Sequence, residues 1–283
     1  MTTIDQFESV FRSAVKPLYR YAPLQVDRVT LVTDLQAEAS AVYRHQVGRL
    51  LSHISPEYWQ VIDSSRYRTT HDLLTLVEGI QSDLICCYRN LHSEAWKYPH
   101  SLGSHLDVLI QRTQTPVLVL PHPAAGYRKK SEFQGMKRVM VITDRLADGS
   151  RLVNHALSFC GETGALYLVH IEDQATFARY IEAIGKITTI DTGEATAAIG
   201  RQLLKAPADY IRTCSEVIES VHRDISVHPI VEFGHHLPDY LDHVRKHEID
   251  LLVMKGKDDD QMAMHGMAYP LAIELRDVPV LII

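Results

Sequence analysis

Three side chains between residues 239 and 247 have the types and the spacing of metal ligands. Asp239, His243 and His247 follow one another at intervals of four residues, so they share one face if this stretch is helical. The apolar stripe of the same stretch falls on other positions, Leu237, Tyr240, Leu241 and Val244. Because that stripe is the face expected to pack against a core, we expect the histidine face to point to solvent, and no metal site is predicted.

No catalytic nucleophile with a neighbouring base can be picked out. The four cysteines have no CxxC spacing, and Cys86 and Cys87 are adjacent inside an apolar run, where thiols are expected to be buried and inert. Neither a Walker loop nor a GxGxxG motif occurs. The sequence therefore predicts a protein that is not an enzyme.

The composition predicts two folding units without a nucleic-acid or membrane role. The 283 residues are 46% hydrophobic, enough for two cores of roughly 100 to 150 residues each. The 29 Lys and Arg against 35 Asp and Glu give a net charge of −6, and the one short basic block is Arg128 to Lys130, which argues against phosphate-backbone binding. We expect a cytoplasmic protein, because there is no apolar run of roughly 18 residues and the first residues do not have the pattern of a signal peptide.

Three apolar segments occur twice in the same order. DRVTLVTD begins at Asp27 and its near-copy KRVMVITD begins at Lys137, 110 residues later. SDLICCY and IDLLVMK have their aspartates at 83 and 250, and TQTPVLVLP and LRDVPVLII have their prolines at 116 and 279. A domain that occurs twice explains these pairs, with the second copy about 57 residues longer between its first two segments (an offset of 167 against 110).

Strands alternate with helices in both copies, which predicts parallel sheets. In the first copy we expect strands at 29–32, 58–64, 84–87 and 117–120, with helices at 36–52, 71–80 and 104–112. In the second we expect strands at 137–144, 165–171, 225–233, 251–254 and 279–283, with helices at 150–160, 237–246 and 267–275. Residues 173–223 are expected to be mostly helical, with breaks near Gly185, Gly193 and Pro207.

The predicted fold class is thus α/β, with two doubly wound parallel-sheet domains. The first, residues 1–122, is abbreviated, and an amphipathic helix near 4–15 is expected to cover the face that its missing segment leaves open. A Pro-, Gly- and charge-rich linker is predicted at 123–136, and the complete second domain at 137–283.

This order of elements resembles the universal stress protein family in its tandem two-domain form. VITD closing the first strand, DLLVM as the fourth and VPVLII as the last carry the resemblance, which covers nearly all of 137–283 and more weakly 27–121. It implies a HUP-like, adenine nucleotide alpha hydrolase-like fold. It also implies that the last strands pair edge to edge, either in a homodimer or between the two domains of one chain.

Family members that bind ATP have a loop of pattern G-x2-G-x9-G-[ST] after the fourth strand, where glycines let backbone N–H groups approach phosphates. In the second copy Lys255 stands at the first glycine, with Gly256 one place late, and Asp258 stands at the second. Seven residues then precede Gly266, and Met267 replaces the Ser or Thr. The acidic run 258–260 would also repel a triphosphate.

The loop of the first copy departs from the pattern in another way. Tyr88 and Leu91 take the two glycine positions, and eleven residues precede Gly103 and Ser104, which keep the Gly-Ser start of a helix. Trp96 in this longer loop either packs over the degenerate site or forms an aromatic anchor for a partner. Neither copy has an intact loop, so we expect ATP binding to be lost.

The sequence therefore predicts a non-enzymatic tandem universal stress protein that acts in the stress response through small-molecule or partner binding. The alternative is an ATP-binding switch with slow hydrolysis, in which Lys255, Lys257 and Mg²⁺ replace the glycine loop. No resident cofactor is expected beyond a weakly held adenine nucleotide with Mg²⁺.

Asp34 and Asp144 either approach an adenosine, as the resemblance implies, or cap the next helix. The candidate ligand-binding residues are Thr143, Asp144, Ile171, Met254, Lys255, Gly256, Lys257 and Gly266 in the second copy, and Asp34, Gly103 and Ser104 in the first.

Overall fold

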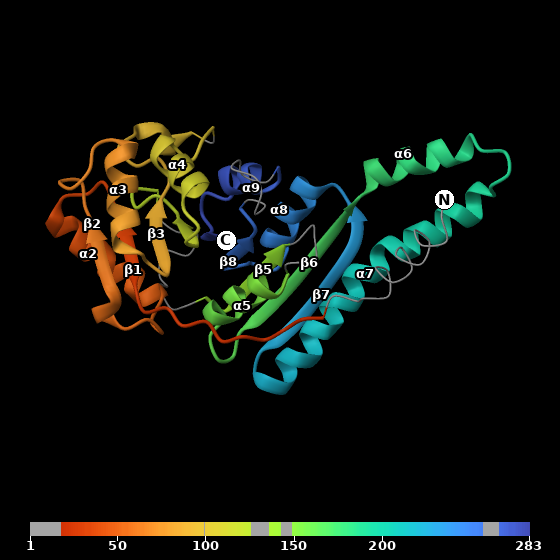
Figure 1. Cartoon of the computed structure of the whole chain (residues 1–283), viewed down its shortest axis with the longest axis horizontal. Coiled ribbons are helices and arrows are strands. Elements are labelled where there is room, and N and C mark those ends of the chain that lie inside the picture. The colour runs from red at the N-terminus through yellow and green to blue at the C-terminus, as the bar shows by residue number, and fades with distance from the viewer. Residues whose placement is uncertain (1–17, 99, 126–135, 143–148, 257–265) are drawn as a thin grey trace, which may run out of the picture.

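The computed structural model describes residues 18–98, 100–125, 136–142, 149–256 and 266–283 (Figure 1). We refer to residues 18–125 as the first half and to residues 136–283 as the second half. The helix expected at 4–15 and most of the expected linker lie outside the described residues. In the described part of the chain, no helix combines the length and the apolar character needed to cross a membrane.

The first half contains four strands and three α-helices within its described residues. The strands are β1 (Val29–Val32), β2 (Trp59–Ile62), β3 (Leu84–Tyr88) and β4 (Val117–Leu120). The helices are α2 (Ala37–Leu50), α3 (Thr70–Ile80) and α4 (Ser104–Arg112), with short 3₁₀ turns at Pro56–Tyr58 and Glu94–Lys97.

The second half is larger. Its strands are β5 (Arg138–Ile142), β6 (Ala165–Asp173), β7 (Ser226–Gly234), β8 (Leu251–Met254) and β9 (Val280–Ile282). Its helices are α5 (Gly149–Phe159), α6 (Gln174–Gly185), α7 (Thr192–Val221), α8 (His236–Lys246) and α9 (Ala268–Glu274).

All of these strands form one sheet, with the order β2-β1-β3-β4-β9-β8-β5-β6-β7. Every neighbouring pair is parallel except β4 and β9, which are antiparallel. The predicted α/β class with a mostly parallel sheet is confirmed. Short apolar runs form the inner strands because both of their faces are covered, and β1, β3, β4 and β8 are buried along their whole length.

The β4–β9 pair joins the two halves symmetrically. Leu118 pairs with Leu281, while Val117 pairs with Ile282 and Val119 with Val280. Pro116 and Pro279 precede equivalent positions of the two strands. Counted from these prolines, the first residue of each strand pairs with the third residue of the other, and the second residues pair with each other. The edge that the last strand of each half would otherwise expose is therefore paired inside the chain.

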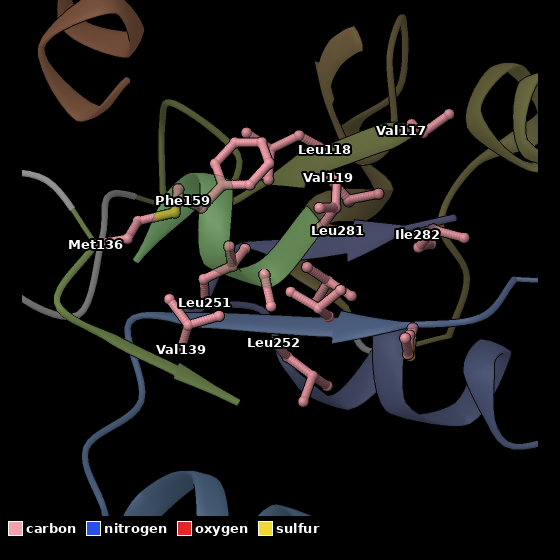
Figure 2. Packing of buried hydrophobic residues seen from close by; sticks show 14 of the residues in the cluster. Val117, Leu118, Val119, Met136, Val139, Phe159, Leu251, Leu252, Leu281 and Ile282 are labelled. Atoms are coloured by element: carbon pink, nitrogen blue, oxygen red, sulfur yellow. The ribbon is translucent and has the colours of Figure 1, made fainter. Parts of the chain in front are cut away.

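The buried apolar side chains form a single cluster that includes residues of both halves. In Figure 2, Leu118 and Val119 on β4 lie next to Leu281 on β9. The ring of Phe159, at the end of α5, meets the ring of His53 from the first half at 5.7 Å between centroids. The junction is thus a packed core as well as a strand ladder.

The additional length of the second half is found in α6, α7 and the outer strand β7. Figure 1 shows α7 running beside β7, while α6 and the start of α7 extend away from the sheet. Phe177 of α6 packs on Phe233 of β7 at 4.7 Å between ring centroids, and Gly200 of α7 leaves room for the Phe177 ring. This contact holds the helical hairpin to the end of the sheet.

The break expected near Pro207 was wrong, because α7 runs from Thr192 to Val221 with Pro207 inside it. A proline in a helix interior costs about 3 kcal/mol relative to alanine. Burial compensates here, since Pro207 lies on the same buried face as Tyr210, Ile211 and Cys214. The expected break at Gly185 is confirmed, because α6 ends there.

Residues 19–22 cross from the first half onto α5 and α7 of the second. The Tyr19 hydroxyl donates to Oδ1 of Asn154 at 2.6 Å, and the Ala22 N–H donates to the same oxygen at 3.3 Å. The Asn154 amide in turn donates to the Arg20 carbonyl at 3.1 Å. Both the oxygen and the nitrogen of the Asn154 amide therefore form hydrogen bonds with this segment.

We expect Asn154→Ala to release the segment and to lower the free energy of unfolding by about 1–3 kcal/mol, because it leaves the buried Tyr19 hydroxyl without an acceptor. Urea unfolding and limited proteolysis near residues 18–26 measure both effects. Arg151→Ala, on an exposed position of the same helix, is the matched control. Equal stability and equal protease resistance of the two variants would contradict the role given to Asn154.

Candidate functional site

The candidate residues of the first half lie at the carboxyl end of its parallel strands. Asp34 follows β1, Tyr88 ends β3, and these two strands are neighbours in the sheet. Crevices beyond the carboxyl ends of parallel strands are the usual ligand sites of open α/β sheets. In this half, side chains of the chain itself occupy that position.

Tyr88 and His92 bind both oxygens of the Asp34 carboxylate. The Tyr88 hydroxyl donates to Oδ1 of Asp34, and the His92 backbone N–H donates to Oδ2 at 2.7 Å. The same hydroxyl accepts from the Asp34 backbone N–H at 3.0 Å and contacts the Thr33 hydroxyl at 3.0 Å. Asp34 is thus held by the β3 strand and its loop, and a ligand hydroxyl would have to share this carboxylate with both donors.

Aromatic rings fill the space around this network. Tyr67 packs on His92 at 4.9 Å and on His105 at 5.6 Å between ring centroids. Tyr88 meets His122 edge-on at 5.1 Å, and Trp96 stacks on His122 at 4.7 Å. Trp96 therefore packs over this site, one of the two roles expected for it.

Burial keeps these groups neutral. It raises the pKa of Tyr88, and the hydrogen bond to Asp34 raises this pKa further, so the phenol stays protonated as a donor. Burial likewise lowers the pKa values of His105 and His122. The site thus has neutral rings around one hydrogen-bonded carboxylate.

Gly103 serves the loop rather than an open anion site. It precedes α4 with φ of +90°, and a Cβ atom there would lie 2.7 Å from Cα of Asn90. The Asn90 N–H donates to the Leu102 carbonyl at 2.6 Å, which closes the loop on itself. Ser104 is the first residue of α4 and is exposed. The glycine is needed because the two backbone segments touch.

In the second half, β5 lies between the parallel strands β8 and β6. Two candidate residues, Met254 on β8 and Ile171 on β6, therefore lie on either side of the end of β5. Val141 of β5 pairs with Val253, and Ile142 pairs with Val169. Met254 and Ile171, which follow on β8 and β6, are both buried. Thr143, Asp144 and Lys257 lie outside the described residues, as does the acidic run 258–260.

The remaining candidates of this half lie near the end of the chain or apart from it. Lys255 is half-buried directly after β8. The Gly256 N–H donates to the Ile283 carbonyl at 2.8 Å, and a Cβ on Gly256 would lie 2.3 Å from Cγ2 of Ile282. Gly266 is exposed. The backbone donor of Gly256 is therefore engaged by the last strand.

The expectation that the α8 histidines face solvent was wrong for His243. Its side chain is buried, with Nε2 2.9 Å from Oε1 of Glu232 on β7, a strand that the helix periodicity could not place beside it. Its ring stacks on His247 at 5.8 Å between centroids. No group of three metal-binding side chains occurs among the described residues.

The sequence reasoning missed the residues that close the first-half site. His92, His105 and Tyr67 come from three separate segments, and no spacing links them. The one available signal was Tyr88 itself, because a large side chain at a glycine position of the loop indicates that the loop no longer leaves space there.

No protein-family model matches the chain, and no curated protein does. Solved structures match its fold. A universal stress protein from Archaeoglobus fulgidus DSM 4304 has a TM-score of 0.53 at 15% identity, over 92% of this chain and 98% of that one. A candidate universal stress protein from Pseudomonas aeruginosa UCBPP-PA14 has a TM-score of 0.53 at 10% identity, over 91% and 93%. A protein of unknown function from Pseudomonas aeruginosa PAO1 has a TM-score of 0.52 at 11% identity, over 91% and 92%. The universal stress protein fold expected from the sequence is confirmed.

Gly103→Ala is expected to lower the free energy of unfolding by about 1–3 kcal/mol, since alanine is strained at this φ and its methyl group meets the Asn90 backbone. Gly79→Ala is the matched control. Gly79 is the second-to-last residue of α3 with no other atom near its Cβ position, so this change is expected to stabilise by up to about 0.5 kcal/mol. Urea unfolding compares the two. Two substitutions with the same sign would show that the Gly103–Asn90 contact is not required.

Proposed function

We propose that this chain is a non-enzymatic, cytoplasmic tandem universal stress protein that acts in the stress response by binding a small molecule or a partner. Its domains would be residues 1–122 and 137–283, with a linker between them. The strand orders of the two halves, β2-β1-β3-β4 and β6-β5-β8-β9, support this division. So does the symmetric register of β4 and β9.

The single observation that carries the proposal is the occupied carboxylate of Asp34. Both of its oxygens accept hydrogen bonds from the chain's own β3 strand and loop, and neutral rings pack around it. A nucleotide hydroxyl at Asp34 would compete with these donors, and the rings around Asp34 would have to move to admit the base, each with an energetic cost. In this proposal the first half is a partner that completes the core.

In the same proposal, any remaining small-molecule site belongs to the second half, at the carboxyl ends of β5 and β8. The engagement of the Gly256 N–H by Ile283 removes a backbone donor that a phosphate would need. We propose that the terminal strands pair within one chain rather than between two chains, so that the working unit is a monomer.

Titration with Mg-ATP tests the function. For the wild-type protein, calorimetry is expected to show no saturable binding below millimolar ATP. A separate assay for inorganic phosphate is expected to show no release above a buffer control. Asp34→Ala and Asp144→Ala remove the corresponding aspartate from each half and are expected to change neither result.

The alternative, an ATP-dependent switch, predicts the opposite pattern. Binding in the micromolar range, lost in Asp144→Ala and kept in Asp34→Ala, would place a working nucleotide site in the second half and overturn the non-enzymatic proposal. Binding lost in Asp34→Ala would show that the first-half site opens.

A further inference from the structure

A cleft of about 450 Å³ lies at the junction of the two halves. Arg89, Trp96 and His122 line it from the first half, and the turn after α9 lines it from the second. None of the candidate ligand-binding residues predicted from the sequence lines this cleft. Its volume falls in the range of small-molecule sites, and its walls come from segments far apart in the chain.

Arg89 is a buried cation in this cleft without a matching carboxylate. It is 2% exposed, and its two terminal nitrogens donate to the Ile273 carbonyl at 3.2 Å and the Leu275 carbonyl at 2.7 Å, at the end of α9. Its Nε has no hydrogen-bond partner, and no described carboxylate forms an ion pair with it. The carbonyl groups and the nearby charge of Asp277 offset the positive charge of Arg89 only in part, and an incompletely compensated charge is costly for a buried ion.

A second guanidinium lies nearby on the other half. Arg276 is exposed, and its Nη1 donates to the Lys97 carbonyl across the junction at 3.5 Å. Burial lowers the pKa of Arg89 to about 10, and the nearby charge of Arg276 adds to this effect while Asp277 opposes it. The two arginines therefore repel each other across the cleft, and an anion between them would relieve that repulsion.

The carboxylates that line the cleft offset the charge of Arg89 only in part. Glu274 and Asp277 are exposed, so water screens their charges, whereas Arg89 lies where the effective dielectric is lower. Lys97 adds a third cation to the lining, although it also pairs with Glu94. The cleft therefore has a buried positive floor and a mixed, solvated rim.

We propose that the cleft binds a phosphate-bearing small molecule, with its phosphate group held between Arg89 and Arg276. Guanidinium groups match phosphate oxygens with several N–H donors at once, and arginines are common ligands of phosphate groups in proteins. Because one arginine comes from each half, the ligand would bridge the junction. The cleft is distinct from the ends of β5 and β8, so phosphate binding here is expected to be kept in Asp144→Ala and weakened in Arg276→Gln, which distinguishes it from binding at a nucleotide site of the second half.

Trp96 provides a direct signal for this cleft. The chain has two tryptophans, and the other, Trp59, lies on β2, at the outer edge of the sheet. In a Trp59→Phe protein, all tryptophan emission comes from Trp96. Titration with inorganic phosphate and with pyrophosphate, at an ionic strength held constant with chloride, is expected to give a saturable change with one site per chain.

Two further variants assign that signal. In the Trp59→Phe background, Arg276→Gln is expected to weaken the phosphate and pyrophosphate affinity by about tenfold or more, because it removes a charged donor. Arg112→Gln removes the same charge from the last residue of α4, which is exposed and does not line the cleft. This variant is expected to leave the affinity unchanged. Arg89 is not varied, because its loss also removes the donors to the end of α9.

Three results would overturn the proposal. The first is an unsaturable response to phosphate and pyrophosphate, or none. The second is an equal affinity in the Arg276→Gln and Arg112→Gln proteins. The third is a saturable response to citrate without one to phosphate or pyrophosphate, which would identify a carboxylate site instead.

Discussion

The antiparallel pairing of β4 with β9 is the interaction on which the rest of this structure depends. Three residue pairs, centred on Leu118 and Leu281, turn two parallel sheets into one and bury the apolar side chains around them. The same pairing brings the end of α9 to Arg89 and creates the cleft between the halves. Without it, each half would expose an apolar edge strand, which is a site of unspecific association.

The two halves have the same order of shared strands but differ at their carboxyl edges. In the first half a phenol, a backbone N–H and several rings replace the space that a ligand would need. In the second half the last residue of the chain engages the backbone donor after β8. In the function proposed above, these hydrogen bonds occupy groups that a glycine-rich loop would leave open for a phosphate.

Much of the fold could be predicted from the sequence because short apolar runs with sharp boundaries specify buried strands. The predicted limits of β1, β4 and β8 agree with the structure, as do those of α4, which begins after Gly103. The helix through Pro207 could not be predicted, because the burial that compensates for proline comes from the sheet beneath it. His243 was misplaced for a similar reason, since its partner Glu232 lies on another element.

The candidate site was harder to predict than the fold. The loop sequences indicated lost glycines, but the groups that replaced them come from segments without a common spacing, such as Tyr67 and His105. The contact of Arg89 with the end of α9 joins residues 184 and 186 positions apart, and no local pattern reports it. Periodicity describes elements, whereas a site depends on how distant elements meet.

Native mass spectrometry of the protein, purified without added nucleotide, tests the central claim most directly, namely that the chain pairs its own terminal strands and holds no nucleotide. The arrangement described above predicts one species at the mass of a single chain, 32.1 kDa. A species at twice that mass would contradict the proposed monomeric working unit. A species heavier by one adenine nucleotide would contradict the proposed loss of nucleotide binding.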